Sequence, residues 1–396
     1  GLLAHRGITV FRANAAFHAD ETAPATSNHI VHLVPSPDQS DILTYHKADV
    51  PEPSGPTMDL TATNIVIATG AKPRPLPGNP FAGALIDSTQ ALEVNEFPSS
   101  AVIIGAGAIA LEFASMWNAA GSKVTLLIRK DRVLSAWDRR AGTTLTRELK
   151  RHGVNIITRA SVTHVDTGAN LGATVHYTCE GQDGEQSVWG EIALVAIGRD
   201  PITDPAWGVT IDDHGHVATD AYGRTDKPGV WAVGDVTAGH ALAHRAFEQG
   251  IVIAETIAGL NPKPVDEATV PQIVFSFPEA ASVGLTVEQA QAREDLIEIK
   301  ETNYPMLANA RMLMSGTAGS LTIVSGCDAA NPDTPRVLGV HMVSQMASDI
   351  IAEAEQLVGN HVPLADAARL VHPHPTFSET LGEALLKADG RPLHTR

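Results

Sequence analysis

A glycine-rich turn between a buried strand and a helix constrains this chain most. Ala101-Val102-Ile103-Ile104 is a run of apolar residues, and Gly105-Ala106-Gly107-Ala108-Ile109-Ala110 follows it directly. Apolar side chains then recur near helical spacing as far as Ala120, and Gly121 is a typical helix end. Residues 124–128 predict a second strand. The order strand, helix, strand is a βαβ unit, which predicts an α/β fold with a parallel sheet.

The turn fits the pattern G-x-G-x-x-G/A of dinucleotide-binding sites. Gly105 allows a tight turn, Gly107 lets the backbone approach a pyrophosphate, and Ala110 keeps helix and strand close. The helix N-terminus offers unpaired N–H groups and a partial positive charge to phosphates. The alternative is a turn that binds nothing, but the flanking strand and helix favour a nucleotide site.

The end of the second strand bears on the choice of nucleotide. NAD sites usually place an acidic residue about 20 positions after the glycines, where it binds the ribose 2′-hydroxyl. This chain has Ile128-Arg129-Lys130 there. Arg129 and Lys130 could hold a 2′-phosphate through charge-assisted hydrogen bonds. The residues therefore favour NADP(H) over NAD, with an ordinary solvated basic loop as the alternative.

Two other strand ends indicate a second dinucleotide site. Thr69 and Gly70 close one predicted strand, and Gly234-Asp235 closes another. An Asp at the carboxyl end of a buried strand faces the crevice where ligands bind in α/β sheets. Taken alone, Asp235 is better explained as a cap of the helix predicted from about Leu242 to Gly259.

A histidine near the C-terminus suggests acid–base chemistry. In His372-Pro373-His374-Pro375-Thr376-Phe377-Ser378-Glu379, two prolines flank His374, and Glu379 could orient its ring. Such a pair suits general acid–base catalysis. Thr376-x-x-Glu379 is also a capping box that could simply start the terminal helix. The residues favour the two interpretations equally, and the interpretations are compatible.

Composition excludes some classes of protein. The net charge of −17 argues against a nucleic-acid-binding surface, which needs a basic face. No apolar run approaches the roughly 20 residues of a membrane span. The only cysteines, Cys179 and Cys327, form no close pair, so a reducing cytoplasm is expected. The chain starts at Gly1 without Met, which indicates a start inside a longer protein.

The motifs occur in the order found in pyridine nucleotide-disulfide reductases, which this chain resembles from about Ile8 to Leu386. The resemblance is carried by five segments, which are residues 105–112, 194–199, 230–236, 278–284 and 374–376. Residues 242–246, 307–311 and 372–379 look most like dihydrolipoamide dehydrogenases. The loop at 127–130, together with Ala110, is instead similar to glutathione reductases, which use NADPH.

The resemblance implies an architecture of two Rossmann-like dinucleotide-binding domains and an α+β dimerisation domain. Residues 1–96 would be the remainder of an FAD-binding domain and 97–205 the NAD(P)-binding domain. Residues 206–265 would return to the FAD domain, and 266–396 would form the dimerisation domain. A homodimer with FAD and NAD(P) as cofactors is expected.

The resemblance also implies residue roles. Residues from several segments would contact FAD. Ala15 would lie near the adenine, and Thr69 and Gly70 would contact the cofactor. Glu112 would lie close to the flavin, Asp235 would bind the ribitol, and Ala243 would lie near the isoalloxazine. Gly198 would line the nicotinamide pocket. His374 would take a proton from a dithiol of the other subunit's site, with Glu379 orienting it. Electrons would pass from a small dithiol or a lipoyl domain to a disulfide, then to FAD and NAD(P)+. A 2-oxo acid dehydrogenase complex is a candidate parent assembly.

The chain departs from the family in two ways. The family's first GxGxxG and its CxxxxC redox pair are absent, and Cys179 and Cys327 match none of the family's redox positions. We therefore expect a fragment that lacks at least one βαβ unit of roughly 30 residues and is inactive alone. One alternative is another NADPH-dependent reductase, such as a glutathione or mercuric reductase. The other is a catalytically inactive dimer or a structural partner of a 2-oxo acid dehydrogenase complex.

Overall fold

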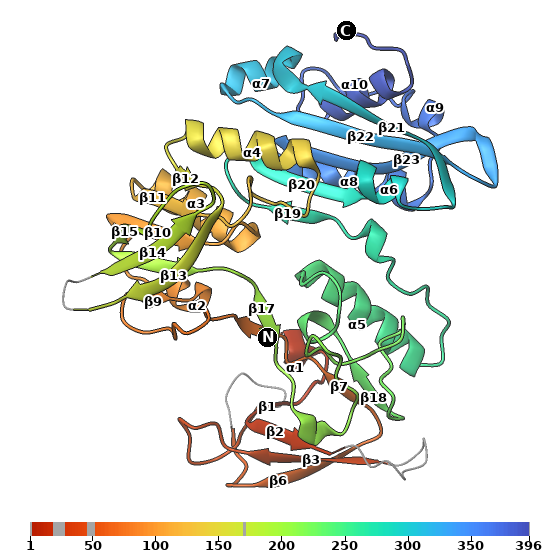
Figure 1. Ribbon diagram of the computed structural model, residues 1–396. Coiled ribbons are helices and arrows are strands. Elements are labelled where there is room, and N and C mark those ends of the chain that lie inside the picture. The colour runs from red at the N-terminus through yellow and green to blue at the C-terminus, as the bar shows by residue number, and fades with distance from the viewer. Residues whose placement is uncertain (1, 19–27, 46–51, 169–171, 396) are drawn as a thin grey trace. The chain divides into compact units, whose positions relative to one another are not determined.

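The computed structural model describes residues 2–18, 28–45, 52–168 and 172–395. The chain divides into two compact units, each built from two separate stretches of sequence. One unit combines residues 1–72 with 200–265, and the other combines 73–199 with 266–396. The chain passes from one unit to the other three times, near β8 (Ala71–Pro73), in β17 (Arg199–Pro201) and after Val265. Figure 1 shows the elements of both units.

The first unit consists of short strands and one long helix. Its strands form two antiparallel sheets, ordered β1-β4-β5 and β2-β3-β6, and one parallel pair, β7 with β18. Its elements are α1 (Leu2–His5), β1 (Val10–Arg12), β2 (Asn14–Phe17), β3 (His29–Val34), β4 (Leu43–Tyr45), β5 (Glu52–Pro53), β6 (Met58–Ala62), β7 (Ile65–Ile67), η1 (Pro205–Trp207), β18 (Val230–Ala232), η2 (Gly234–Val236) and α5 (Ala243–Ile257). Phe17 stacks on Trp207 beside a small apolar core that includes Ile67 and Val230.

The first half of the second unit is a parallel sheet covered on both faces. Its strand order is β12-β11-β10-β16-β9, and the antiparallel sheet β13-β14-β15 lies against it. The elements are β9 (Leu85–Ile86), α2 (Ser88–Leu92), β10 (Ser100–Ile104), α3 (Ala108–Ala119), β11 (Lys123–Leu127), α4 (Arg139–Arg151), β12 (Asn155–Ile157), β13 (Ala160–Asp166), β14 (Ala173–Cys179), β15 (Gln186–Gly190) and β16 (Ile192–Val195).

Alternation along β10 explains why this strand is apolar throughout. Ala101 and Ile103 pack with the helices α3 and α4, whereas Val102 and Ile104 pack with β13 and β14. Successive side chains of a strand point to opposite faces, so a parallel strand buried on both faces needs a continuous apolar run. The result is three layers in which the sheet holds the start of α3 in place.

The second half of this unit is a five-stranded antiparallel sheet with helices packed on it, ordered β19-β20-β23-β22-β21. Its elements are η3 (Glu267–Thr269), β19 (Gln272–Val274), β20 (Glu279–Gly284), α6 (Val287–Gln291), β21 (Leu296–Pro305), η4 (Met306–Ala308), α7 (Ala310–Ser315), β22 (Ser320–Asp328), β23 (Asn331–Ser344), α8 (Ala347–Gly359), α9 (Leu364–Ala367) and α10 (Glu379–Ala388). Helix α8 buries Ile350, Ile351, Ala354, Leu357 and Val358, the face expected from its spacing.

Helices with strong patterns lie close to where the sequence places them. The helix α3 ends one residue before the predicted Ala120. The strand β16 ends at Val195, and Gly198 follows it with φ +128°.

Candidate functional site

The turn between β10 and α3 needs glycine at its first position. Gly105 has φ +142°, and a Cβ atom there would lie 2.2 Å from the carbonyl oxygen of Ala196. The same Cβ would lie 3.4 Å from the side chain of Ala110, which is fully buried. Any larger residue at either position would push the helix away from the sheet.

Gly107 is different, because no neighbouring protein atom requires a glycine there. It is the N-cap of α3 with φ −90°, and a Cβ there would meet no atom of the described residues within 4 Å. No side chain caps this helix. An uncapped helix N-terminus beside an open glycine fits the phosphates of a dinucleotide, which accept from free N–H groups and need close approach to the backbone.

A cavity of about 590 Å³ opens beside this turn. Gly105 and Ala106 line it together with Arg129 and Lys130, which follow β11. Its other walls are Arg74, Leu76, Pro77, Ile104, Leu127, Ser135, Ala160, Ser161, Val162 and Ile197. The glycine turn and the basic pair predicted from the sequence therefore share one cavity.

The side chains of Arg129 and Lys130 are exposed, but the backbone around them is held by hydrogen bonds. Lys130 O accepts from Arg159 N at 3.0 Å, and the O of the fully buried Ile128 accepts from Ala160 N at 3.0 Å. Within the described part of the chain, Arg129 and Lys130 form no ion pair, whereas Arg132 pairs with Asp131 at 3.1 Å. The positive charges of Arg129 and Lys130 are thus available to an anionic group in the cavity.

Two further predicted residues lie near this turn. Gly198 directly follows the cavity residue Ile197, and its carbonyl oxygen accepts from Arg74 N at 3.1 Å. Glu112, in the second turn of α3, accepts from Phe275 N at 3.0 Å through Oε1. Glu112 therefore ties α3 to the residue after β19.

The residues predicted to contact FAD belong mainly to the first unit. Strands β7 and β18 are parallel, so Thr69, Gly70 and Asp235 follow the carboxyl ends of neighbouring strands. Thr69 Oγ1 donates to Ile202 O at 2.6 Å, and Gly70 O accepts from Ile202 N at 2.9 Å. Ala15 is exposed on β2, which belongs to a different sheet from β7 and β18.

The interpretation of Asp235 as a helix cap is wrong. Asp235 lies in the 3₁₀ turn η2, whereas α5 begins at Ala243 with Leu242 as its N-cap and has no side-chain cap. A hydrogen bond connects the second turn of α5 to η2 instead, because Gln249 Oε1 accepts from Gly234 N at 3.0 Å. Ala243 is exposed in the first turn of α5.

The histidine near the C-terminus is paired as the sequence suggests. His374 Nδ1 lies 2.7 Å from Glu379 Oε2, and Glu379 N donates to Thr376 Oγ1 at 3.2 Å. Glu379 thus both begins α10 and contacts the imidazole. The His374 side chain is 73% exposed, while that of Glu379 is only 16% exposed. A carboxylate on Nδ1 keeps a proton there and leaves Nε2 as the basic nitrogen.

A third residue, which sequence reasoning did not single out, completes this arrangement. Asn309 Nδ2 donates to Glu379 Oε1 at 2.7 Å and to Thr376 O at 3.0 Å. Asn309 is buried, and its own Oδ1 caps α7 by accepting from Met312 N. The only signal for it was the resemblance of residues 307–311, because a contact across 70 residues leaves no local pattern.

The two cysteines do not form a redox centre. Cys179 ends β14 and Cys327 lies in β22, and both are buried free thiols. Burial raises the pKa of the Cys327 thiol, which disfavours the reactive thiolate.

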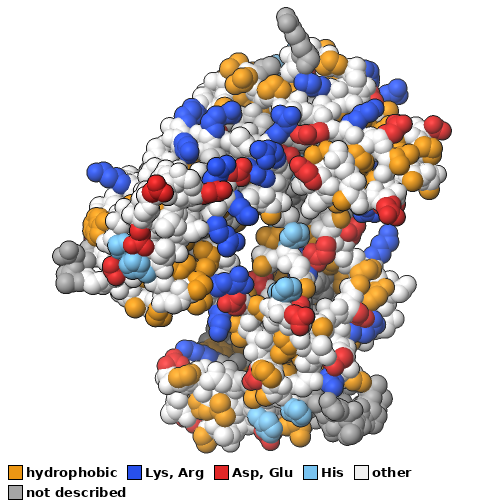
Figure 2. Space-filling model, in the orientation of Figure 1, with side chains coloured by type: hydrophobic (Ala, Val, Ile, Leu, Met, Phe, Trp, Pro, Cys, Tyr) orange, Lys and Arg blue, Asp and Glu red, His pale blue; other side chains and the backbone are white. Residues whose placement is uncertain are grey.

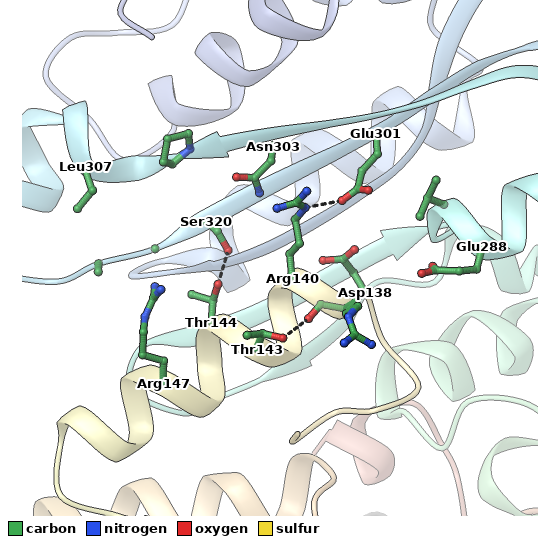
Figure 3. Close-up of a pocket in the computed structure, with 15 residues that line it drawn as sticks. Asp138, Arg140, Thr143, Thr144, Arg147, Glu288, Glu301, Asn303, Leu307 and Ser320 are labelled. Carbon is green, nitrogen blue, oxygen red and sulfur yellow. Dashed lines mark hydrogen bonds and ion pairs between the residues drawn. The ribbon is translucent and has the colours of Figure 1, made fainter. Parts of the chain in front are cut away.

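A second cavity, of about 610 Å³, lies between α4 and the strands β21 and β22. Figure 3 shows Arg140 pointing to Glu301, at 2.7 Å, and Thr144 pointing to Ser320, at 3.1 Å. None of the predicted site residues lines it. Its polar contacts join α4, in the first half of the unit, to the C-terminal sheet.

Comparison with known proteins places the chain in a family. A family model described as pyridine nucleotide-disulphide oxidoreductase matches residues 19–250, and that family's dimerisation domain matches residues 270–385. Dihydrolipoyl dehydrogenases from Cupriavidus necator and Bacillus subtilis are 38% and 36% identical over 341 residues, which is 85% of this chain and 70% of each relative.

Solved structures agree with these sequence matches. LpdA from Mycobacterium tuberculosis superposes with a TM-score of 0.79 at 25% identity, covering 95% of this chain and 76% of that one. The HOCl-induced flavoprotein disulfide reductase RclA from Escherichia coli gives a TM-score of 0.73 at 27% identity. That match covers 83% of this chain and 74% of RclA.

These matches confirm the α/β fold with Rossmann-like FAD and NAD domains and a dimerisation domain. No helix among the described residues is long and apolar enough to cross a membrane. The order of motifs, the strand-to-helix turn and the matches over most of the sequence agree. The chain belongs to the pyridine nucleotide-disulphide oxidoreductase family.

Proposed function

We propose that the chain provides the nicotinamide site, the flavin-contacting segments and the acid–base pair of a dihydrolipoamide dehydrogenase-like enzyme that prefers NADP(H). The observation that carries the proposal is the cavity beside α3, in which an open glycine turn meets two cations that form no ion pair among the described residues. In the same proposal, residues 1–96 and 206–265 serve FAD, 97–205 serve the nicotinamide nucleotide, and 266–396 form a homodimer interface.

The nucleotide site would act through the backbone and two side chains. The free N–H groups at the start of α3 would donate to the pyrophosphate, and Gly107 would allow its close approach. Arg129 and Lys130 would bind the 2′-phosphate. Glu112 and Gly198 would lie toward the reacting rings, by resemblance to the family.

The flavin site is proposed at the shared carboxyl edge of β7 and β18. Asp235, Thr69 and Gly70 at this edge would hold the ribitol and neighbouring groups, with Ala243 near the ring and Ala15 near the adenine. FAD, when bound, supplies a two-electron carrier between a dithiol and the nicotinamide.

His374 would serve as the base that takes a proton from the dithiol. Its Nε2 would accept the proton, and the Glu379 carboxylate at 2.7 Å would stabilise the imidazolium that forms. Asn309 holds the carboxylate in position from its other oxygen. The exposure of His374 suits a partner group supplied by a second subunit, or by a lipoyl domain.

Coenzyme titration of Arg129→Ser/Lys130→Ser tests the nucleotide assignment. A charge-assisted hydrogen bond contributes about 1.5–3 kcal/mol, and about 1.4 kcal/mol corresponds to a tenfold change in Kd. Because the double variant removes two such bonds, about 3–6 kcal/mol together, we expect NADPH affinity to fall at least about 100-fold and NADH affinity to change little. Lys123→Ser/Lys150→Ser removes the same charge at two exposed positions outside the cavity and serves as control. Equal losses for NADPH and NADH would refute the assignment.

A catalytically inactive dimer, or a structural partner of a 2-oxo acid dehydrogenase complex, is the second candidate function. It is favoured by the absence of a close cysteine pair among the 396 residues. Protein expressed from the complete gene decides between the two. Dihydrolipoamide-dependent reduction of NADP+ supports the enzyme, whereas FAD-loaded protein without turnover supports the inactive partner.

A further inference from the structure

Two histidines face each other on the outer side of the sheet β13-β14-β15. Along β14, Val175 and Tyr177 are buried, so His176 points to the other face. A register shift in β13 between Val162 and His164 places His164 directly opposite His176. The two imidazole rings stack with centroids 4.0 Å apart and an interplanar angle of 7°.

One carboxylate lies on the Nδ1 edge of both rings. Glu185 Oε1 is 3.8 Å from His164 Nδ1, and Glu185 Oε2 is 3.6 Å from His176 Nδ1. Thr163 Oγ1 donates to Glu185 Oε1 at 2.7 Å and so holds the carboxylate in place. One potential ligand atom from each of His164, His176 and Glu185 lies within 4.8 Å of the others.

A second carboxylate lies on the opposite edge. Asp166 Oδ2 is 3.1 Å from His176 Nε2 and 3.8 Å from His164 Nε2. Histidines that bind a metal usually donate their other ring N–H to a carboxylate, which fixes the tautomer and orients the ring. Asp166 stands where such a partner is needed if Nδ1 is the ligand atom.

We propose that His164 Nδ1, His176 Nδ1 and Glu185 bind one divalent late transition-metal ion, such as Zn²⁺, with Asp166 as the partner of the distal nitrogens. Imidazole and carboxylate ligands suit Zn²⁺, Cu²⁺ and Ni²⁺. The two carboxylates together carry the charge that neutralises such an ion.

The distances from Glu185 approach those around a single ion. Ligands about 2.0–2.1 Å from Zn²⁺ in tetrahedral geometry lie roughly 3.4 Å apart. The Glu185-to-imidazole distances of 3.8 and 3.6 Å exceed this separation by only a few tenths of an ångström. The two rings, parallel to within 7°, must also rotate out of their stack so that both Nδ1 lone pairs point at the ion.

The cluster is open to solvent and is separate from the nucleotide site. The side chains of His164, His176 and Glu185 are 47%, 22% and 45% exposed. Figure 2 shows histidine side chains beside carboxylates on this part of the surface. None of the three ligands lines the cavity beside α3. With three protein ligands in the open, a bound ion would keep a coordination position for water.

Zinc titration of the whole chain by isothermal calorimetry tests the site. We expect one Zn²⁺ per chain at neutral pH, lost in His164→Ala/His176→Ala. Asp166→Asn, which keeps all three ligands, should weaken binding about 10- to 100-fold. His32→Ala is the control, because His32 is an exposed histidine paired with a single carboxylate, Asp59, at 2.6 Å.

Cu²⁺ electron paramagnetic resonance gives a second readout that does not depend on affinity alone. Coupling to two nitrogens is expected for the unmodified chain and for His32→Ala, and is lost in the double variant. Stoichiometric binding that persists in a folded double variant, or an equal loss in His32→Ala, would overturn the proposal.

Discussion

Substitution by alanine should lower the stability of the fold at Gly105 and the affinity for NADPH at Gly107. In Gly105→Ala, the residue must keep φ +142° and place a Cβ 2.2 Å from the Ala196 carbonyl oxygen. Backbone strain of this kind costs about 1–3 kcal/mol, and overpacking adds about 1–3 kcal/mol. We expect a loss of about 2–6 kcal/mol in the free energy of unfolding, hence a fall in Tm of roughly 4–20 °C.

Gly107→Ala should instead spare the fold and impair the site. Its φ is −90° and its Cβ meets no described atom within 4 Å, so only the poorer N-cap costs stability, about 0.5–1 kcal/mol. The new methyl group would stand where the pyrophosphate approaches. We therefore expect NADPH affinity to fall at least roughly tenfold, the equivalent of about 1.4 kcal/mol.

Thermal unfolding by circular dichroism and NADPH fluorescence titration measure the two effects on the same samples. A Tm of Gly105→Ala equal to that of the unmodified protein, or an unchanged NADPH affinity of Gly107→Ala, would show that the two glycines do not have these separate roles.

The remaining predictions concern pH and the thiols. Burial lowers the pKa of His341 from 6.5. As the pH falls, the unfolded chain therefore takes up a proton before the folded chain does, and the free energy of unfolding should decrease below about pH 6.5. In urea unfolding, His341→Gln should show a smaller decrease over the same pH range. The hydrogen bond that His372 donates to the Glu353 carboxylate raises the pKa of His372 from 6.5. The stabilisation from this pair should therefore be complete below about pH 6.5 and lost as the pH rises through the raised value. A Glu353→Gln stability profile that matches the unmodified one would count against this. The 396-residue chain should not reduce NAD+ or NADP+ with dihydrolipoamide, and Cys179→Ser/Cys327→Ser should leave this rate unchanged, because the two cysteines form no close pair. Robust turnover by the unmodified chain would contradict this.

Local patterns predicted the elements that position the nucleotide site. The apolar run before Gly105 and the helical spacing after it required no knowledge of distant residues, and α3 ends within one residue of its predicted end. Arg129 and Lys130 were singled out by their distance from the glycines, and both line the cavity beside α3. These features could be predicted because they depend on residues that are close in the sequence.

Features that depend on distant partners could not be predicted. The Asn309 contact with Glu379 spans 70 residues, and the His164–His176 stack depends on a register shift between two strands. Taken alone, Asp235 was better explained as a helix cap, which is wrong because it lies in the 3₁₀ turn η2, ahead of α5 and its N-cap Leu242. The packing of α4 on the C-terminal sheet, through contacts such as Thr144 with Ser320, is likewise visible only in the folded unit.

Hydrogen–deuterium exchange with and without NADPH locates the nucleotide on the chain. Saturating NADPH should slow amide exchange in peptides covering residues 104–112, where the N–H groups of α3 would meet the phosphates, and 128–132. NADH should protect the first segment and leave the second nearly unchanged. Saturable NADPH binding without protection at residues 104–112 would rule out a nucleotide site at this turn.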